Sequence, residues 1–238
     1  MRLRLNDPDL VRREYADESG LSARIAAQES STGPDPRQVA FEAVAETSPR
    51  RVLEVGPGRG ELAARIRDEL GAEVVAVDQS PRMVELTRSR GVEAVVGDVQ
   101  ALPFVPGRFD CVLAAWMLYH VPDLDQALRE LRRVLTPHGR LVAVTNSKDT
   151  LRELWELVGY DGASAGGFSA ESGQGPLLKH FTIVERRDVR GTVTFPDREA
   201  AYAYVAASPT RSHLADALPF FEGPLRASRH VVVFVCQP

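Results

Sequence analysis

Short apolar runs alternate with amphipathic stretches along most of this 238-residue chain. The apolar runs have the length and composition of buried strands, and the stretches between them have helical spacing. The strands are predicted at about 51–56, 73–77, 92–96, 109–115 and 139–146. The helices are predicted at about 60–70, 81–89, 123–135 and 148–158. This alternation specifies a parallel sheet with helices on both faces.

The later part of the chain continues the pattern less regularly. Residues 161–175 are rich in glycine and serine, which predicts a loop. A strand-like run at 180–195 follows, then a helix at 197–208 and a second helix near 211–221. The run at 229–236 has the composition of a last strand.

The junction of the first strand and first helix, RVLEVGPGRGE at 51–61, carries the strongest local signal. Gly56, Gly58 and Gly60 stand at alternate positions directly after a buried strand. Glycine adopts positive φ and lets a ligand approach the backbone closely, and the following helix offers free N–H groups. A strand, a glycine turn and a helix make a nucleotide-type crevice at the carboxyl end of a strand. Glycine turns of this kind also occur as plain tight connections.

An acidic residue, Asp78, ends the second predicted strand, eighteen positions after Gly60. A carboxylate at this place accepts hydrogen bonds from two vicinal ribose hydroxyls. The alternative is that Asp78 caps the next helix, but Ser80 and Pro81 already supply an N-cap and a first-turn proline. We therefore favour ribose binding.

Composition agrees with a globular enzyme. Hydrophobic residues make up 44% and charged residues 26%, close to the averages of folded domains. The net charge of −4 gives no general attraction to nucleic acid. Cys111 and Cys236 lie in apolar runs and are expected to be buried thiols, with no zinc spacing. No apolar run reaches transmembrane length and no signal-peptide core is visible, so we expect a cytoplasmic protein.

Five motifs in order make the block 51–147 resemble class I S-adenosylmethionine (SAM)-dependent methyltransferases of the type-11-like group, which includes the ubiquinone and menaquinone methyltransferases. The motifs are LEVGPGRGELA, AVDQSPRMVE, VVGDVQALPF, FDCVLAAWMLYHV and LRRVLTPHGRLVAVTNS. The resemblance implies a single domain over 1–238 with a Rossmann-like, doubly wound, seven-stranded α/β sheet whose last strand is antiparallel. Its last strand would lie at 228–236.

The resemblance also implies a role for particular residues toward SAM. Those expected along the methionine part are Glu54, Gly56, Gly58 and Gly60. Asp78 would hold the ribose, with Gln79 and Met83 against the adenine. Asp98 would accept from the adenine amino group beside the backbone of Val99. Ala115 and Trp116 would close the site after the fourth strand.

Segments outside the core are expected to form the substrate side. They are an N-terminal arm at 1–40, additions at 161–222 and, within these, a helical insert at 197–222. The arm is predicted to be a helical lid, with Tyr15 and Arg24 near the methionine end, because an arginine fork binds carboxylates bidentately. Tyr15 could instead pack on the sheet and Arg24 could simply be solvated.

Methyl transfer from a sulfonium is an in-line displacement and needs a base only if the acceptor must lose a proton. Tyr119 and His120 are the candidate bases, and His120 could equally be structural. No metal is expected, because Ala114 and Ala115 stand where catechol-type enzymes carry an acidic ligand.

The sequence leaves the acceptor open. The favoured function is methyl transfer to an N, O or C atom of a small molecule. Recognition of an RNA or protein acceptor would require a basic surface or an added recognition module, and the sequence shows neither. Two further hypotheses are a SAM-binding regulatory or scaffold protein without transfer activity and, more remotely, a nicotinamide-dependent oxidoreductase. The oligomeric state, monomer or homodimer, is open.

Overall fold

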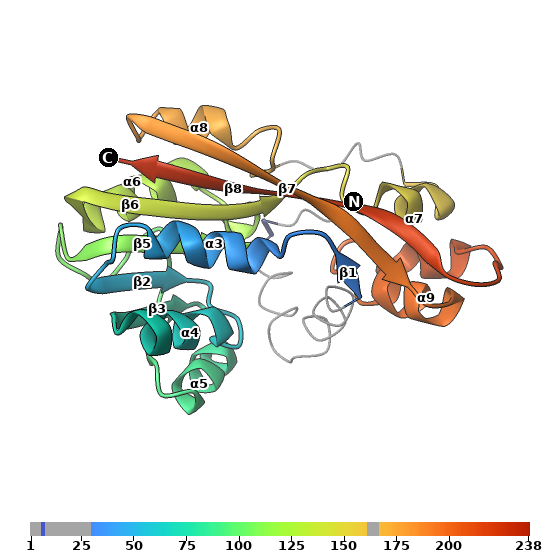
Figure 1. Ribbon diagram of the computed structural model, residues 1–238, viewed down its shortest axis with the longest axis horizontal. Coiled ribbons are helices and arrows are strands. Elements are labelled where there is room, and N and C mark those ends of the chain that lie inside the picture. The colour runs from blue at the N-terminus through green and yellow to red at the C-terminus, as the bar shows by residue number, and fades with distance from the viewer. Residues whose placement is uncertain (1–5, 8–29, 161–166) are drawn as a thin grey trace.

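The computed structural model describes residues 6–7, 30–160 and 167–238 (Figure 1). Tyr15 and Arg24, and most of the predicted N-terminal lid, lie outside the described residues. The expected contacts of these two residues with the cofactor therefore stay predictions.

Within the described residues the strands form one eight-stranded mixed sheet, in the order β1-β7-β8-β6-β5-β2-β3-β4. Their bounds are β1 Ser31–Thr32, β2 Arg51–Val55, β3 Glu73–Asp78, β4 Glu93–Val96, β5 Phe109–Ala115, β6 Leu135–Asn146, β7 Ile183–Phe195 and β8 Leu225–Gln237. The five strands β2 to β6 pair in parallel. The last strand, β8, pairs antiparallel with both β6 and β7, which confirms its predicted direction. The predicted number of seven strands was one short, because the two-residue β1 also pairs with β7.

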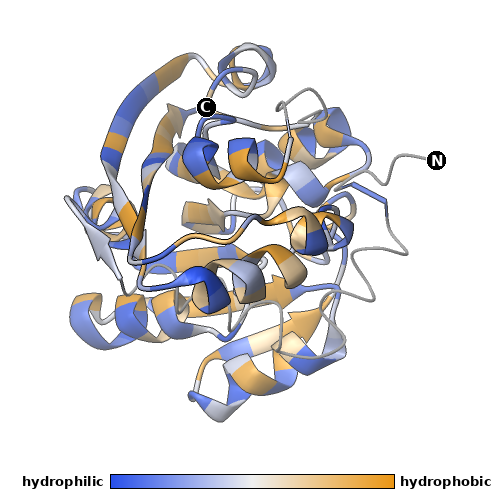
Figure 2. Cartoon of the chain, turned by 90° about the vertical axis from the view of Figure 1, so that its right-hand side faces the viewer, coloured by the Kyte–Doolittle hydropathy of each residue, from blue (hydrophilic) through white to orange (hydrophobic). Residues whose placement is uncertain are grey.

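Helices cover both faces of the sheet, as the alternation predicted. They are α3 Pro36–Ala45, α4 Glu61–Leu70, α5 Pro81–Ser89, α6 Leu124–Val134, α7 Arg152–Leu157, α8 Gln174–Leu178, α9 Arg198–Ala206 and the 3₁₀ turns η1 Leu118–His120 and η2 Ser212–Ala217. One hydrophobic cluster joins the sheet to α3, α4 and α5, and another joins its opposite face to α6 and α8. Strand residues alternate between the two clusters, as in Leu53 and Val52, because successive side chains point to opposite faces. Figure 2 shows hydrophobic colouring concentrated in the strands between the helices.

Several elements differ from the sequence prediction. Helix α3 was not expected, although Asp35 caps it by accepting from the Arg37 N–H at 2.9 Å and Pro36 begins it. Helix α8 lies partly within the stretch predicted as a loop. The second late helix is only the short 3₁₀ turn η2. Helix α7 starts later than predicted, after Leu151, whose φ of 59° is left-handed.

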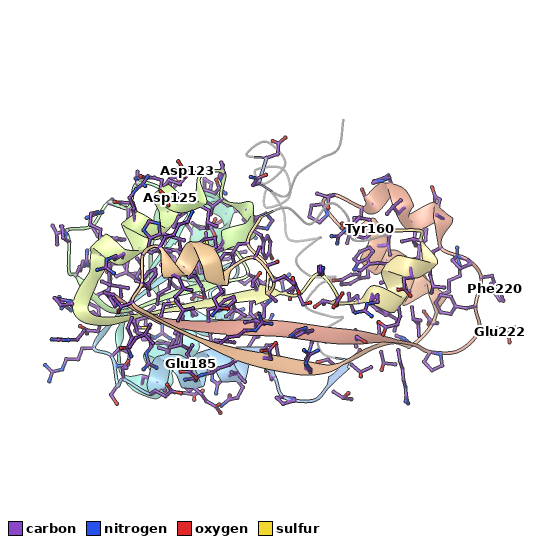
Figure 3. The ribbon with its side chains drawn as sticks, turned by 90° about the horizontal axis from the view of Figure 1, so that it is seen from above. Asp123, Asp125, Tyr160, Glu185, Phe220 and Glu222 are labelled. Atoms are coloured by element: carbon purple, nitrogen blue, oxygen red, sulfur yellow. The ribbon has the colours of Figure 1, made fainter. Side chains whose placement is uncertain are left out.

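The strands β7 and β8 are long enough to reach beyond the parallel core. Both have 13 residues and pair along their whole length. At the far end they pack with α7, α9 and η2 into a third hydrophobic cluster, which we call the distal cluster. Its residues are Leu151, Leu154, Trp155, Val158, Val193, Phe195, Ala201, Val205, Ala215, Leu218 and Ala227. Figure 3 shows this end, with Tyr160, Phe220 and Glu222, set apart from the end that carries Asp123 and Glu185.

Candidate active site

The glycine turn between β2 and α4 has the conformation that the sequence predicted. Gly56, Gly58 and Gly60 have φ angles of 67°, 58° and 76°, a region that residues with a Cβ rarely adopt. A Cβ on Gly56 would lie 2.7 Å from the Cβ of Met117. A Cβ on Gly60 would lie 2.9 Å from Thr87 on α5. The first glycine therefore brings the turn against the end of β5, and the third lets α4 approach α5.

Asp78 ends β3, beside the glycine turn. Its carboxylate accepts from the Ser80 N–H at 2.9 Å and from the N–H groups of Gly58 and Gln79. The helix after it is capped by the Ser80 hydroxyl, which accepts from the Met83 N–H at 3.3 Å. The cap is therefore supplied by Ser80, as the sequence predicted. Burial raises the pKa of Asp78 to about 6, against the lowering effect of these hydrogen bonds.

Glu54 lies one strand position before the last residue of β2 and is 2% exposed. Its carboxylate accepts from the Ala63 N–H of α4, while Oε2 is buried with no hydrogen-bond partner among the described residues. Burial raises its pKa to about 8, with a smaller contribution from the charge of Asp78. An orphaned carboxylate oxygen of this kind is suited to a cationic partner or a proton.

Replacing Glu54 with glutamine is expected to flatten the pH dependence of stability. An acid whose pKa is raised on folding binds more protons in the native state, so stability falls as pH rises from the unfolded value of 4.5 through the folded value of about 8. Between about pH 5 and pH 8 the wild-type free energy of unfolding should fall by roughly 3–4 kcal/mol more than that of Glu54→Gln. Urea titrations at each pH without ligand measure this. Parallel plots of unfolding free energy against pH for the wild type and Glu54→Gln would show that folding does not raise the pKa of Glu54.

Asp98 follows β4 at the same edge of the sheet. Its Oδ1 accepts from the Gln100 N–H at 2.8 Å, and the Gln100 side-chain amide donates to both carboxylate oxygens at 3.1 and 3.0 Å. Gln100 Oε1 in turn accepts from the Asp123 N–H at the start of α6. Asp98 is exposed and Val99 beside it is buried. Gln100 thus fixes the Asp98 carboxylate, a role that the sequence analysis missed.

The chain leaves β5 through Ala115 and Trp116 and enters η1. Trp116 has a φ of 53°, and its indole Nε1 donates to Asn146 Oδ1 at 3.1 Å. In η1 the rings of Tyr119 and His120 contact edge to face, with centroids 4.5 Å apart. His120 is buried, and its backbone N–H donates to the Met117 carbonyl.

These elements border a cavity of about 590 Å³ at the carboxyl ends of the parallel strands. The structure brings most of the predicted site residues to its wall: Glu54, Gly56, Gly58, Asp78, Gln79, Asp98, Val99, Ala115, Trp116, Tyr119 and His120. Gly60 and Met83 do not border it, and the side chain of Met83, a residue of α5, is fully buried. The volume falls within the usual range of small-molecule sites.

Other residues of the wall come from late elements of the chain; the sequence offered Tyr204 as a possible acceptor-pocket residue without ranking it, and gave no sign of the others. Tyr204, Val193, Val231 and Arg229 reach it from α9, β7 and β8. Arg229 is 5% exposed and donates to Ser31 Oγ at 2.6 Å and to the Pro34 carbonyl at 2.5 Å. It therefore holds the segment before α3 against the sheet. The long-range pairing of β7 and β8 brings these residues together.

The described residues contain no cluster of three or more histidine, cysteine or acidic side chains with metal-ligating geometry. The two cysteines, Cys111 and Cys236, are buried, as expected, and burial raises the pKa of each thiol to about 12. Among the described helices none has the length and apolar character needed to cross a membrane.

Comparison with known proteins decides the family. A family model described as a methyltransferase domain matches residues 53–143. An uncharacterized methyltransferase of Mycobacterium bovis is 34% identical over 173 residues, covering 68% of each chain. The chain belongs to the SAM-dependent methyltransferases. A demethylmenaquinone methyltransferase of Thermus thermophilus is 39% identical to this methyltransferase over 115 residues, 45% of this chain and 52% of that one.

Solved structures agree on the fold. The YcgJ protein of Bacillus subtilis superposes with a TM-score of 0.63 at 17% identity, over 84% of this chain and 97% of that one. The family model ends before β7, β8 and α9, so the wall that they add to the cavity lies outside the matched core.

The cofactor of this methyltransferase is SAM, and the residues present fit it. Glycines at positive φ let a ligand approach the turn, Asp78 offers acceptors, and the unpaired Glu54 Oε2 offers an acceptor to an ammonium.

Proposed function

We propose that this methyltransferase moves the methyl group of SAM to an N, O or C atom of a small-molecule acceptor. The observation that carries the proposal is the cavity that joins the glycine turn and Asp78 to Tyr204 and Val193 of the distal part. A nucleoside at the tips of β2, β3 and β4 leaves the side toward β6 and β8 for the acceptor. A volume of about 590 Å³ suits a small molecule better than an extended polymer.

In this proposal the cofactor residues divide between the two ends of SAM. Glu54, Gly56 and Gly58 lie along the methionine part, and Asp78 accepts from the ribose hydroxyls. Gln79, Asp98 and Val99 surround the adenine.

Met83 is proposed to act only by fixing the helix start after Asp78, since its side chain does not border the cavity. Gly60 is proposed to act through the close approach of α4 to α5. Tyr15 and Arg24 are retained as proposed contacts of the methionine end.

The protein's part in the reaction is alignment and exclusion of water. The bound sulfonium supplies an electrophilic methyl group. Ala115 and Trp116 stand at the end of β5, between the two halves of the cavity, and are proposed to close the cofactor half there. Holding the acceptor in line with the methyl and sulfur supplies most of the acceleration. Where the acceptor must lose a proton, Tyr119 and His120 are the proposed bases, since both border the cavity.

The proposal is tested by incubating the protein with SAM and panels of small phenols, amines and activated carbon acids, and measuring release of S-adenosylhomocysteine (SAH). Release that depends on one of these classes supports it. Release only with transfer RNA or protein substrates would contradict a small-molecule acceptor. Tight SAH binding without turnover on any class would favour a regulatory SAM-binding protein.

A further inference from the structure

Trp116 has a backbone conformation that bulky residues rarely adopt. It is the first residue after β5, and its φ of 53° lies in the left-handed region. Its N–H donates to the Val144 carbonyl of β6 at 2.9 Å, which fixes the strained turn. Conformations of this kind persist where the surrounding structure determines them, and they cluster at functional sites.

The indole ring also has a hydrogen bond to the neighbouring strand. Its Nε1 donates to Oδ1 of Asn146, the last residue of the neighbouring strand β6, at 3.1 Å. The ring is half-buried against the hydrophobic cluster of the α3 and α4 face and also borders the cavity. Trp116 therefore places an aromatic side chain with a fixed indole N–H at the wall of the cavity.

Trp116 follows β5, which lies in the sheet between β2, the strand that leads into the glycine turn, and β6. The next residue, Met117, lies against the glycine turn, where only the missing Cβ of Gly56 leaves it room. On the other side the wall continues with Leu151, Val193, Tyr204 and Val231, together with the polar Thr150 and Arg229. An acceptor placed next to a methyl group at the glycine turn would therefore lie beside the indole.

We propose that Trp116 is the stacking surface for the acceptor, that Asn146 is the residue that positions it, and that the enzyme selects acceptors with a planar aromatic or conjugated face. A planar ring stacks on an indole in offset or edge-to-face geometry. A ring that is already fixed loses little freedom when the ligand binds. The inference rests on the proposed function, because it assigns a role to the part of the cavity that bound SAM would leave empty.

The test compares a planar probe with its saturated counterpart. Calorimetry with saturating SAH measures the affinity of the wild-type protein for 2-naphthol and for decahydro-2-naphthol. Both carry one hydroxyl on a fused two-ring frame, so they differ mainly in the planar π-system. Stacking predicts that 2-naphthol binds roughly fivefold or more tightly.

Substitutions show whether the preference belongs to Trp116. Trp116→Leu should bring the two affinities together, whereas Trp116→Phe should keep a preference for the planar probe. Asn146→Leu should reduce the preference, and Asn146→Asp should retain it because an oxygen acceptor remains for Nε1. Phe220→Leu is the matched control, because this aromatic residue is 80% exposed at the distal end (Figure 3) and should leave the preference unchanged.

Equal affinities in the wild-type protein, no binding of either naphthol, or a preference that survives Trp116→Leu would overturn the inference. Binding of SAH alone is measured first. If SAH does not bind, the proposed function fails. If SAH binds and the planar preference is absent, only this inference fails.

Discussion

Replacing Asp78 with asparagine is expected to weaken SAH binding about 100-fold. The substitution removes the charge and turns one oxygen into a donor, so both charge-assisted bonds to the ribose hydroxyls are lost or weakened. At about 1.5 kcal/mol for each such bond, the combined loss is near 3 kcal/mol. Isothermal titration calorimetry at about pH 8, where the carboxyl is ionised, measures the effect directly.

The matched control is Asp68→Asn on α4, whose side chain is 60% exposed and pairs with Arg67. It should leave the affinity unchanged. The wild-type affinity should also fall as pH drops below about 6, the pKa to which burial raises Asp78, and the Asp78→Asn protein should lose this dependence. An affinity within about threefold of wild type would show that Asp78 does not contact the nucleoside.

Replacing Gly56 with alanine is expected to damage both stability and cofactor binding. The new Cβ would lie 2.7 Å from the Met117 Cβ, and the φ of 67° already disfavours a side chain. The left-handed backbone costs about 1 kcal/mol and the overpacking about 1–3 kcal/mol more. The turn must then shift, so SAH affinity should fall at least tenfold, as calorimetry would show.

Gly71→Ala separates the cost of the left-handed backbone from the cost of the close contact with Met117. Gly71 follows α4 with a φ of 65°, nearly the same as that of Gly56, but a Cβ there would meet nothing within 4 Å. Gly71→Ala should lower the free energy of unfolding in urea by about 1 kcal/mol, the cost of the left-handed backbone alone, and should leave SAH affinity unchanged. Equal effects of the two substitutions would mean that the contact between the glycine turn and Met117 has no energetic importance.

The sequence predicted the parallel core well because each signal there is local. A buried run, a glycine turn and a helix fix β2 and α4 within about twenty residues, and Ser80 and Pro81 mark the start of α5. The same locality placed Asp78 and Asp98 at neighbouring strand ends. The start of α3 was predictable too, since Asp35 and Pro36 form a recognisable cap.

The rest depends on contacts between distant parts of the chain. Tyr204 and Arg229 reach the cavity only because β7 and β8 pair along 13 residues beyond the core, a register that no single segment encodes. The strained turn at Trp116 is fixed by the Val144 carbonyl, and its indole is held by Asn146, both on the neighbouring strand β6. Gly60 is predicted as a ligand contact, and the structure adds a packing requirement, because a Cβ there would lie 2.9 Å from Thr87 on α5. A motif thus predicts the importance of a residue more reliably than it predicts the contacts that the residue makes.

A crystal structure of the protein with SAH is the most direct measurement of where the cofactor lies. The account predicts the nucleoside across the tips of β2, β3 and β4, with both ribose hydroxyls within hydrogen-bond distance of the Asp78 carboxylate and the sulfur facing Trp116. Density for SAH elsewhere, or a ribose turned away from Asp78, would contradict it.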